Sequence, residues 1–427
     1  MKILIINYAY FIIGGPERYM FNVKQLLEEH GHVVIPFSMD LKENVETKYS
    51  KYFASSINPD NTFFFNGKSS LKTKIKQIFR LFYSREVEKK LSLLIQKEKP
   101  DIAYILHYHK KLSPSVLVAC KKNNLPIVVR LSDYLMLCPQ GHFYKNGKIC
   151  EKCKKTKFNS VRYKCVKNSL SASIIWFLAD KYHHLMKFYD LIDYFVITNS
   201  FMKQKIIEYG FRNKISIIPT FAFKQTNQII SCKEKNIIQQ ICYIGKITEF
   251  KGADLLLYAF KQISVFYPKL KLVIMGRDEI NFVRPFIKEN PDLNIIYKNH
   301  SSKAMVLKTF SESLYSILPV KWYENLPNVI LESFSVGTPV IGTNIGSIKS
   351  AIKDGNTGYL FNYNDPNDLT NVILKAINIK QDEYNNLQEN CIDDIKNKYN
   401  SEVHYKKLLK LFGGLKNGMC SNNYIQM

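Results

Sequence analysis

The sequence lacks the features that mark several common classes of protein. No apolar run among its 427 residues is long enough to span a bilayer. The apolar start at residues 1–7 is too short for a signal peptide and has no small-residue cleavage site. We therefore expect a cytoplasmic protein whose nine cysteines are mostly reduced. A Gly-x-Gly-x-x-Gly fingerprint is also missing, which argues against a nicotinamide-binding domain.

Acidic residues are scarce, with 36 Asp and Glu against 61 Lys and Arg and a net charge of +25. Such an excess favours anionic partners, although a solvated, lysine-rich surface without a specific role is the alternative. The sequence has no helix-turn-helix, zinc-finger or RNA-recognition signature to accompany the charge. A basic nucleic-acid-binding protein is therefore the less favoured reading, and we expect phosphorylated small molecules or anionic lipid instead.

The length predicts two domains of about 200 residues each. Short apolar strands alternate with helical patterns twice along the chain, which predicts α/β domains with parallel sheets. We divide the chain into an N-terminal domain (1–220), a polar linker (221–240), a C-terminal domain (241–395) and a C-terminal helix and tail (396–427). Two such domains leave a cleft between them, where a ligand is expected.

Two glutamates, Glu324 and Glu332, are separated by seven residues around Pro327. Proline suits the first turn of a helix, so Glu324 is expected on the preceding loop and Glu332 within the helix. The exposed amides at a helix start suit a pyrophosphate, and the two carboxylates could hold hydroxyls of a sugar and a ribose. Two unrelated surface glutamates would give the same spacing.

Two further segments contain residues that suit phosphate binding. Gly245-Lys246 ends a predicted strand and Lys251-Gly252 opens the next helix, so both cations could reach one diphosphate. Gly14-Gly15 follows the first strand, where glycine lets the backbone approach a phosphate or sugar closely. An ordinary basic loop and a simple tight turn are the alternatives.

Together these segments resemble one family. Gly-Gly-x-Glu-Arg at residues 14–18, Gly-Lys-x4-Lys-Gly at 245–252, Glu-x7-Glu at 324–332 and the stretches at 337–341 and 346–360 look like the retaining glycosyltransferases of family 4. The order and spacing match along nearly the whole chain. The resemblance implies the GT-B fold, in which two Rossmann-like doubly wound domains face each other across a cleft.

The resemblance also implies roles for individual residues. Lys246, Lys251 and Glu324 would be catalytic, with Lys246 at a position where the family usually has arginine. Asp133 would face the acceptor, although Ser132 replaces the histidine that often precedes it. Loops near Gly276-Arg277 and at residues 299–301 would contact the nucleotide base. The donor would be held by Gly15, Gly245, Gly276, Asn325, Leu326, Pro327, Asn328, Val329 and Glu332.

The implied reaction moves a hexose from a nucleotide-diphosphate sugar to a saccharide acceptor with retention of configuration. Two lysines and helix amides would stabilise the charge that develops on the departing diphosphate. The family typically needs no metal for this step, and the sequence has no Asp-x-Asp motif. We expect a role in capsule, exopolysaccharide or lipopolysaccharide O-chain synthesis. A sugar-nucleotide epimerase or hydrolase of the same fold is the alternative enzyme.

Four cysteines, at positions 138, 150, 153 and 165, have the spacing C-x11-C-x2-C-x11-C. A close pair with two further thiols is what a structural tetrahedral zinc site needs. Similar cysteine insertions occur in some members of the resembled family. Four free thiols are the alternative, and His142 could replace one ligand.

Cations and large apolar residues are interleaved at helical spacing over residues 71–82. This amphipathic segment predicts that the N-terminal domain docks on the anionic inner face of the cell membrane, where a lipid-linked acceptor would lie. The alternative is that Ile75, Ile78, Phe79 and Phe82 pack into the core.

Overall fold

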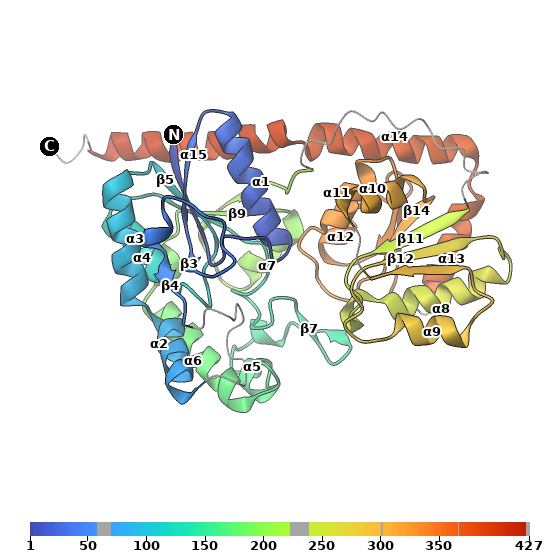
Figure 1. Cartoon of the computed structure of the whole chain (residues 1–427), viewed down its shortest axis with the longest axis horizontal. Coiled ribbons are helices and arrows are strands. Elements are labelled where there is room, and N and C mark those ends of the chain that lie inside the picture. Colours follow the sequence, from blue (N-terminus) through green and yellow to red (C-terminus); the bar gives the residue numbers. More distant parts are fainter. Residues whose placement is uncertain (58–69, 223–238, 300–301, 366, 424–427) are drawn as a thin grey trace.

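A computed structural model describes residues 1–57, 70–222, 239–299, 302–365 and 367–423. The chain forms two α/β domains, and two long C-terminal helices run along one side of both (Figure 1). Most of the expected linker, at residues 223–238, lies outside the described residues, as do residues 300 and 301 of a predicted base-contacting loop. Within the part of the chain that is described, no helix combines the length and the apolar character needed to cross a membrane.

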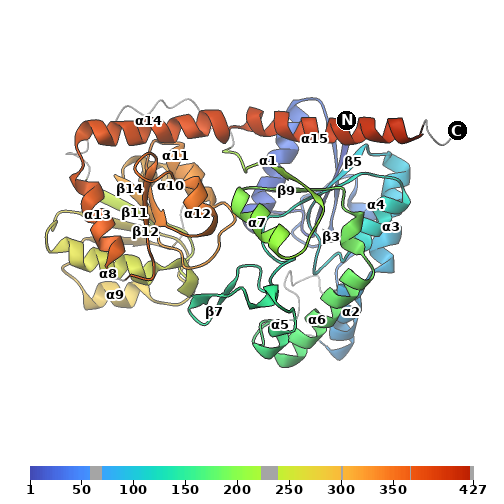
Figure 2. The same cartoon turned by 180° about the vertical axis from the view of Figure 1, so that it is seen from behind.

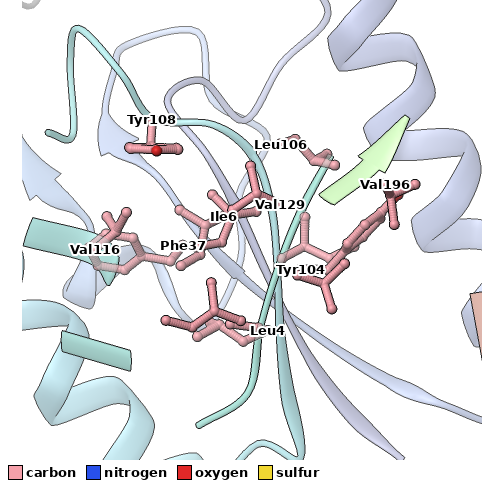
Figure 3. Packing of buried hydrophobic residues seen from close by; sticks show 14 of the residues in the cluster. Leu4, Ile6, Phe37, Tyr104, Leu106, Tyr108, Val116, Val129 and Val196 are labelled. Atoms are coloured by element: carbon pink, nitrogen blue, oxygen red, sulfur yellow. The ribbon is translucent and has the colours of Figure 1, made fainter. Parts of the chain in front are cut away.

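The N-terminal domain is built on a six-stranded sheet of order β10-β9-β6-β5-β1-β2, in which every pair is parallel. Side chains on both faces of its central strands are buried, which explains why these strands read as continuous apolar runs. Ile6, Tyr104 and Val129 meet in this core (Figure 3). The strands are β1 (Lys2–Asn7), β2 (Val33–Phe37), β5 (Ile102–His107), β6 (Ile127–Arg130), β9 (Tyr194–Ile197) and β10 (Lys214–Ile217).

Side-chain caps define where several helices of this domain begin. The side chains of Ser70, Ser84, Ser169 and Asn199 each accept a hydrogen bond from a backbone N–H three residues further on. The helices are α1 (Gly15–Glu29), α2 (Leu71–Phe82), α3 (Arg85–Glu98), α4 (Ser115–Lys122), α5 (Asn159–Arg162), α6 (Leu170–Leu185) and α7 (Ser200–Glu208). Two small strand pairs complete the domain: β3 (Met39–Asp40) with β4 (Ala54–Ser55), and β7 (Tyr144–Lys145) with β8 (Lys148–Ile149).

The C-terminal domain has a second six-stranded parallel sheet, of order β13-β12-β11-β14-β15-β16. Its strands are β11 (Gln240–Ile244), β12 (Lys271–Met275), β13 (Ile295–Lys298), β14 (Tyr315–Leu318), β15 (Val340–Thr343) and β16 (Gly358–Phe361). Its helices are α8 (Ala253–Ser264), α9 (Val283–Glu289), α10 (Lys303–Ser311), α11 (Asn328–Phe334), α12 (Gly346–Ala351) and α13 (Asp368–Asn378), with a 3₁₀ turn at Glu249–Lys251 before α8. The expected α/β class with two parallel-sheet domains is therefore confirmed.

Gly252 closes the turn between Lys251 and α8. It has φ = +72°, and a Cβ at this position would lie 1.8 Å from the carbonyl oxygen of Pro319. A residue with a side chain would therefore meet both backbone strain and a clash with β14's following loop. Glycine at this position lets Lys251 come close to the segment that carries Glu324.

The last two helices lead the chain from the C-terminal domain back to the N-terminal domain. α14 (Gln381–Lys398) packs on α11 in the C-terminal domain, and α15 (Ser401–Asn423) lies along the N-terminal domain (Figures 1 and 2). Leu408 and Phe412 of α15 join the N-terminal core, and His404 Nε2 lies 3.0 Å from the hydroxyl of Tyr19. The C-terminal helix is thus part of the N-terminal domain's fold.

Candidate active site

Lys251 and Glu324 are in direct contact at the carboxyl ends of the C-terminal sheet strands. Glu324 lies on the loop between β14 and α11, and its Oε1 also accepts a hydrogen bond of 2.9 Å from the indole N–H of Trp322. The ammonium of Lys251 lies 5.2 Å from the centroid of the Trp322 ring. Both charged side chains are largely shielded, with 24% and 12% exposure. The structure therefore brings together two of the three residues that were predicted to be catalytic.

Lys246 lies on the same side of the domain but has a different partner. Its Nζ is 3.2 Å from Glu279 Oε1, and its side chain is 68% exposed. Tyr243 donates a 2.8 Å hydrogen bond to the backbone carbonyl of Lys246 and fixes the loop that carries it. The exposed Lys246 ammonium, paired with Glu279, is accessible to an incoming anion, whereas Lys251 is held against Glu324 and shielded from solvent.

The starts of two helices, one from each domain, face each other. Gly15 begins α1 and Asn328 begins α11, and a Cβ on Gly15 would lie 3.5 Å from Asn328 Nδ2. One turn further along α11, Glu332 Oε1 is 3.7 Å from a guanidinium nitrogen of Arg18. Burial raises the pKa of Glu332, and the nearby charges of Arg18 and Lys303 lower it only in part. Gly15, Asn328 and Glu332 thus lie close together where α1 and α11 meet.

Asn325 connects the C-terminal domain to the N-terminal sheet. Its Nδ2 donates to the backbone carbonyl of Leu131 at 3.0 Å, and the backbone carbonyl of Asn325 accepts from Asn199 Nδ2 at 2.6 Å. Thr198 donates to its side-chain oxygen. The side chain that was predicted to touch the donor is therefore engaged in holding the two domains together.

The remaining predicted donor contacts lie around this pair. Gly245 and Gly276 follow β11 and β12, and a Cβ on Gly276 would lie 1.9 Å from the carbonyl oxygen of Gly245. Leu326, Pro327 and Val329 lie on the loop before α11 and in its first turn. Pro327 precedes the helix as its cap, one position before the expected first turn, while Glu324 and Glu332 lie on the loop and in the helix as predicted.

Asp133 follows β6 and has a partner that the sequence reading missed. Asp133 Oδ2 lies 3.3 Å from Nε2 of His107, the last residue of β5, and Oδ1 accepts from the backbone N–H of Leu135 at 2.9 Å. Burial lowers the pKa of His107, but the contact with Asp133 outweighs it, so the pKa is raised overall. Burial raises the pKa of Asp133, but His107 and the hydrogen bond from the Leu135 amide together outweigh it and leave the pKa below its usual value. A histidine from the neighbouring strand β5 thus contacts the carboxylate that follows Ser132.

The four cysteines of the predicted zinc site gather in one region of the N-terminal domain. Cys138, Cys153 and Cys165 are buried and Cys150 is half-buried. Burial and then the neighbouring cysteine Cys138 raise the pKa of Cys153 to about 12 and that of Cys165 to about 11. Among the described residues, no group of three or more His, Cys, Asp or Glu side chains converges closely enough to hold a metal ion. The zinc site therefore stays a prediction.

Comparison with known proteins supports a sugar-transferring enzyme. Residues 227–397 match the model of the family described as Glycosyl transferases group 1. An uncharacterised glycosyltransferase of Methanocaldococcus jannaschii is 25% identical over 307 residues, which cover 69% of this chain and 67% of that protein. An uncharacterised 42.6 kDa protein in the cps region of Klebsiella pneumoniae is 22% identical over 82% of this chain and 86% of its own length. The capsular polysaccharide biosynthesis glycosyltransferase CapM of Staphylococcus aureus is 24% identical over 51% of this chain and 58% of that protein.

Solved structures establish the fold over the whole chain. A sucrose-phosphate synthase from Thermosynechococcus elongatus superposes with a TM-score of 0.69 at 14% identity and covers 98% of this chain and 99% of its own. HepE of Anabaena, solved in complex with UDP and glucose, has a TM-score of 0.60 at 14% identity and covers 97% of this chain and all of its own. The chain has the GT-B fold, and its match to the group 1 glycosyltransferase model covers residues 227–397.

Proposed function

We propose that this chain, whose C-terminal domain matches the group 1 glycosyltransferases, is a retaining hexosyltransferase. It takes a hexose from a nucleotide-diphosphate sugar and adds it to a lipid-linked saccharide in the synthesis of a bacterial surface polysaccharide. The observation that carries the proposal is the Lys251–Glu324 pair, held by Trp322 at the boundary between the two domains. The cps-region relative and the capsular relative support the assignment to polysaccharide synthesis.

The chemistry assigns each charged group a task. As the bond from the anomeric carbon to the diphosphate oxygen breaks, negative charge grows on the leaving group, and Lys251 and Lys246 stabilise it. The acceptor hydroxyl attacks the same face, so the new bond retains the configuration, and its proton passes to the departing diphosphate oxygen. Glu324 holds the sugar by its hydroxyls and keeps Lys251 in place. This scheme needs neither a protein nucleophile nor a metal ion.

The acceptor side lies at the ends of β5 and β6. Asp133 is held as a carboxylate by His107 and by the Leu135 amide, so it can accept a hydrogen bond from a sugar hydroxyl. The HepE structure with UDP and glucose makes UDP-hexoses the first donors to test. An epimerase or hydrolase would release its product without an added saccharide, and the acceptor requirement separates these alternatives.

Two helices give the N-terminal domain a surface suited to a membrane. Leu71, Ile75 and Phe79 lie four residues apart on α2 and are exposed, Leu71 by 75% and Phe79 by 70%. α2 packs beside α6, which exposes Leu170, Ile174 and Leu178 at the same spacing. We name these six residues the α2–α6 apolar surface. The two helices that carry them lie on the side of the domain opposite α15 (Figures 1 and 2).

The inward side of α2 carries a buried arginine, and the apolar residues of the helix face outward. Arg80 is buried, where it pairs with Glu86 at 2.7 Å and donates to the Ser55 carbonyl at 2.6 Å. Ile75 and Phe79 therefore do not pack into the core, while Ile78 and Phe82 are half-buried. Lys72 and Lys76 are exposed on the same helix. Apolar side chains beside cations match an anionic lipid surface, so we propose peripheral docking on the inner face of the cell membrane.

The direct test is donor binding followed by transfer. The purified protein is heated with a panel of nucleotide sugars, and the donor that raises Tm is then supplied, radiolabelled, with lipid extract from a polysaccharide-producing bacterium. We expect stabilisation by one nucleotide sugar and transfer of label to lipid, with the anomeric configuration of the product fixed by NMR coupling constants. Stabilisation by none of the nucleotide sugars, or release of free sugar without transfer, would contradict the proposal.

A further inference from the structure

The segment that carries the four cysteines, residues 138–165, reaches from the N-terminal domain to the donor site. The ring of His142 stacks on Phe250 with centroids 5.5 Å apart and planes 20° apart. The same ring meets Trp322 edge-on at 5.2 Å and 72°. Phe250 directly precedes Lys251, and Trp322 donates to Glu324. One imidazole from the acceptor-binding domain thus touches both aromatic neighbours of the catalytic pair.

The backbone beside His142 is held in an uncommon conformation. Phe143 has φ = +54°, a left-handed value that costs a bulky residue free energy and persists only when surrounding contacts fix it. Those contacts exist, because the Phe143 ring packs against Tyr134, Tyr209 and Tyr323 with centroids between 5.1 and 5.8 Å away. The conformation directs two consecutive aromatic rings toward the C-terminal domain.

A polar contact fixes the same segment to the loop that carries Glu324. Glu151 accepts a 2.8 Å hydrogen bond from the hydroxyl of Tyr323 and pairs with Lys205 at 2.8 Å. Tyr134, just before the segment, donates to the backbone carbonyl of Glu324 at 3.2 Å. The loop from Trp322 to Glu324 is therefore held from the N-terminal domain at three successive residues.

The imidazole acts here as a ring and not as a charge. Burial and the charge of Lys110 lower the pKa of His142 to about 4, although Glu324 and Asp133 oppose the shift. At neutral pH the ring is uncharged and does not repel the nearby ammonium of Lys251. Its Nδ1 is buried without a hydrogen-bond partner among the described residues, so this atom orients none of the neighbouring groups.

We propose that His142 is a positioning residue that completes the donor site from the opposite domain. By packing on Phe250 and Trp322, it fixes the indole whose N–H orients Glu324 and whose ring faces Lys251. The donor site is then fully ordered only when the cysteine segment is in place. Its effect on catalysis rests on the proposed function, whereas its effect on Trp322 does not.

The protein's two tryptophans allow a direct measurement. In a Trp176→Phe background, Trp322 is the single tryptophan of the full-length protein, and excitation at the red edge, where the 27 tyrosines do not absorb, reports on it alone. His142→Ala should shift its emission to the red and increase its quenching by acrylamide, and should lower kcat about 10- to 100-fold with a smaller change in KM for the donor. His142→Phe, which keeps a ring, should restore both properties. Lys148→Ala, at an exposed position in the β7–β8 pair that follows His142, serves as the matched control.

Each outcome decides one point. Unchanged Trp322 emission and quenching in His142→Ala would overturn the positioning role, whether or not the protein transfers sugar. A His142→Phe protein with normal emission but the low kcat of His142→Ala would also overturn it, because the imidazole would then act chemically. If the wild type fails to transfer sugar while the emission shifts as expected, the proposed function fails and the positioning role stands.

Discussion

Lys251 and Glu324 form an ion pair at the domain boundary, although 73 residues separate them in the sequence. Trp322 contacts both members of the pair, and both are largely shielded from water. The geometry of the pair is therefore set before a donor binds. Preorganised charges of this kind contribute most where charge develops in the transition state.

Removal of either partner should therefore reduce catalysis and leave the fold intact. We expect Lys251→Ala and Glu324→Ala each to lower kcat by roughly 100- to 1000-fold, with an unchanged circular dichroism spectrum. Lys308→Ala, which breaks an exposed pair with Glu312 in the same domain, is the control and should keep wild-type activity. Sugar transfer by Lys251→Ala at the wild-type rate would show that the site is assigned incorrectly.

The contact between His107 and Asp133 predicts a defined dependence of stability on pH. Because the pKa of His107 is raised in the folded state, its contribution is fully present below the usual value of 6.5 and is lost as pH rises through the raised pKa. The difference in unfolding free energy between wild type and His107→Gln should thus be largest near pH 6 and shrink toward pH 9. Urea unfolding across this range measures it, and a difference that grows with pH would refute the assignment.

The cysteine segment predicts one bound zinc per chain. Elemental analysis of protein purified without chelator should find it, and replacing Cys150 and Cys153 by serine should release it. Hydrogen exchange should then quicken over residues 138–165 while the C-terminal domain keeps its protection. Replacing Cys120, a buried cysteine outside the segment, is the control for loss of a thiol. A metal-free protein of equal stability and full activity would exclude the zinc site.

The α2–α6 apolar surface predicts binding to vesicles that contain anionic lipid. Co-sedimentation at low salt should fall sharply for Lys72/Lys74/Lys76→Glu, since each basic residue near an anionic surface contributes on the order of 1 kcal/mol. Ile75/Phe79→Ser removes two exposed apolar side chains without changing the net charge of the protein, and it should also weaken binding. Lys269/Lys288/Lys349→Glu, at three exposed lysines of the other domain, changes the net charge by the same amount and is the control. Equal binding by all variants, or none by wild type, would argue against docking.

Gly252 predicts a large local cost for a single methyl group. Gly252→Ala adds a Cβ 1.8 Å from the Pro319 carbonyl oxygen at φ = +72°. Gly355 has a similar φ of +70° with nothing within 4 Å of its Cβ, so Gly355→Ala isolates the backbone cost of about 1 kcal/mol. We expect Gly252→Ala to lower Tm markedly more than Gly355→Ala. Equal Tm values would mean that the turn relaxes freely.

Sequence patterns predicted most strands of both sheets because central parallel strands are apolar on both faces. β13 (Ile295–Lys298) lacks this apolar pattern, since it is an edge strand whose residues alternate between half-buried and exposed. The closeness of Lys251 and Glu324 was predictable, because both follow parallel strands whose carboxyl ends share one edge. The closeness of His107 and Asp133 depends on β5 lying next to β6, which no local pattern encodes.

The orientation of α2 could not be read from its amphipathic pattern either. Interleaved cations and apolar residues define two faces but do not say which one packs inward. The choice is decided by Arg80, whose partners Glu86 and Ser55 belong to other segments. The position of His142 against Phe250 likewise depends on how the domains meet, and motif spacing contains no information on that.

Ala222, the last residue described before 223–238, donates a 2.8 Å hydrogen bond to the carbonyl of Tyr399, which directly follows α14. Because α14 packs on the C-terminal domain and α15 on the N-terminal domain, this contact lies where the two domains are joined. A rotation of one domain against the other about this contact would move the chain least at Ala222 and would draw His142 away from Trp322. Donor entry and the separation of His142 from Trp322 would then be one and the same motion.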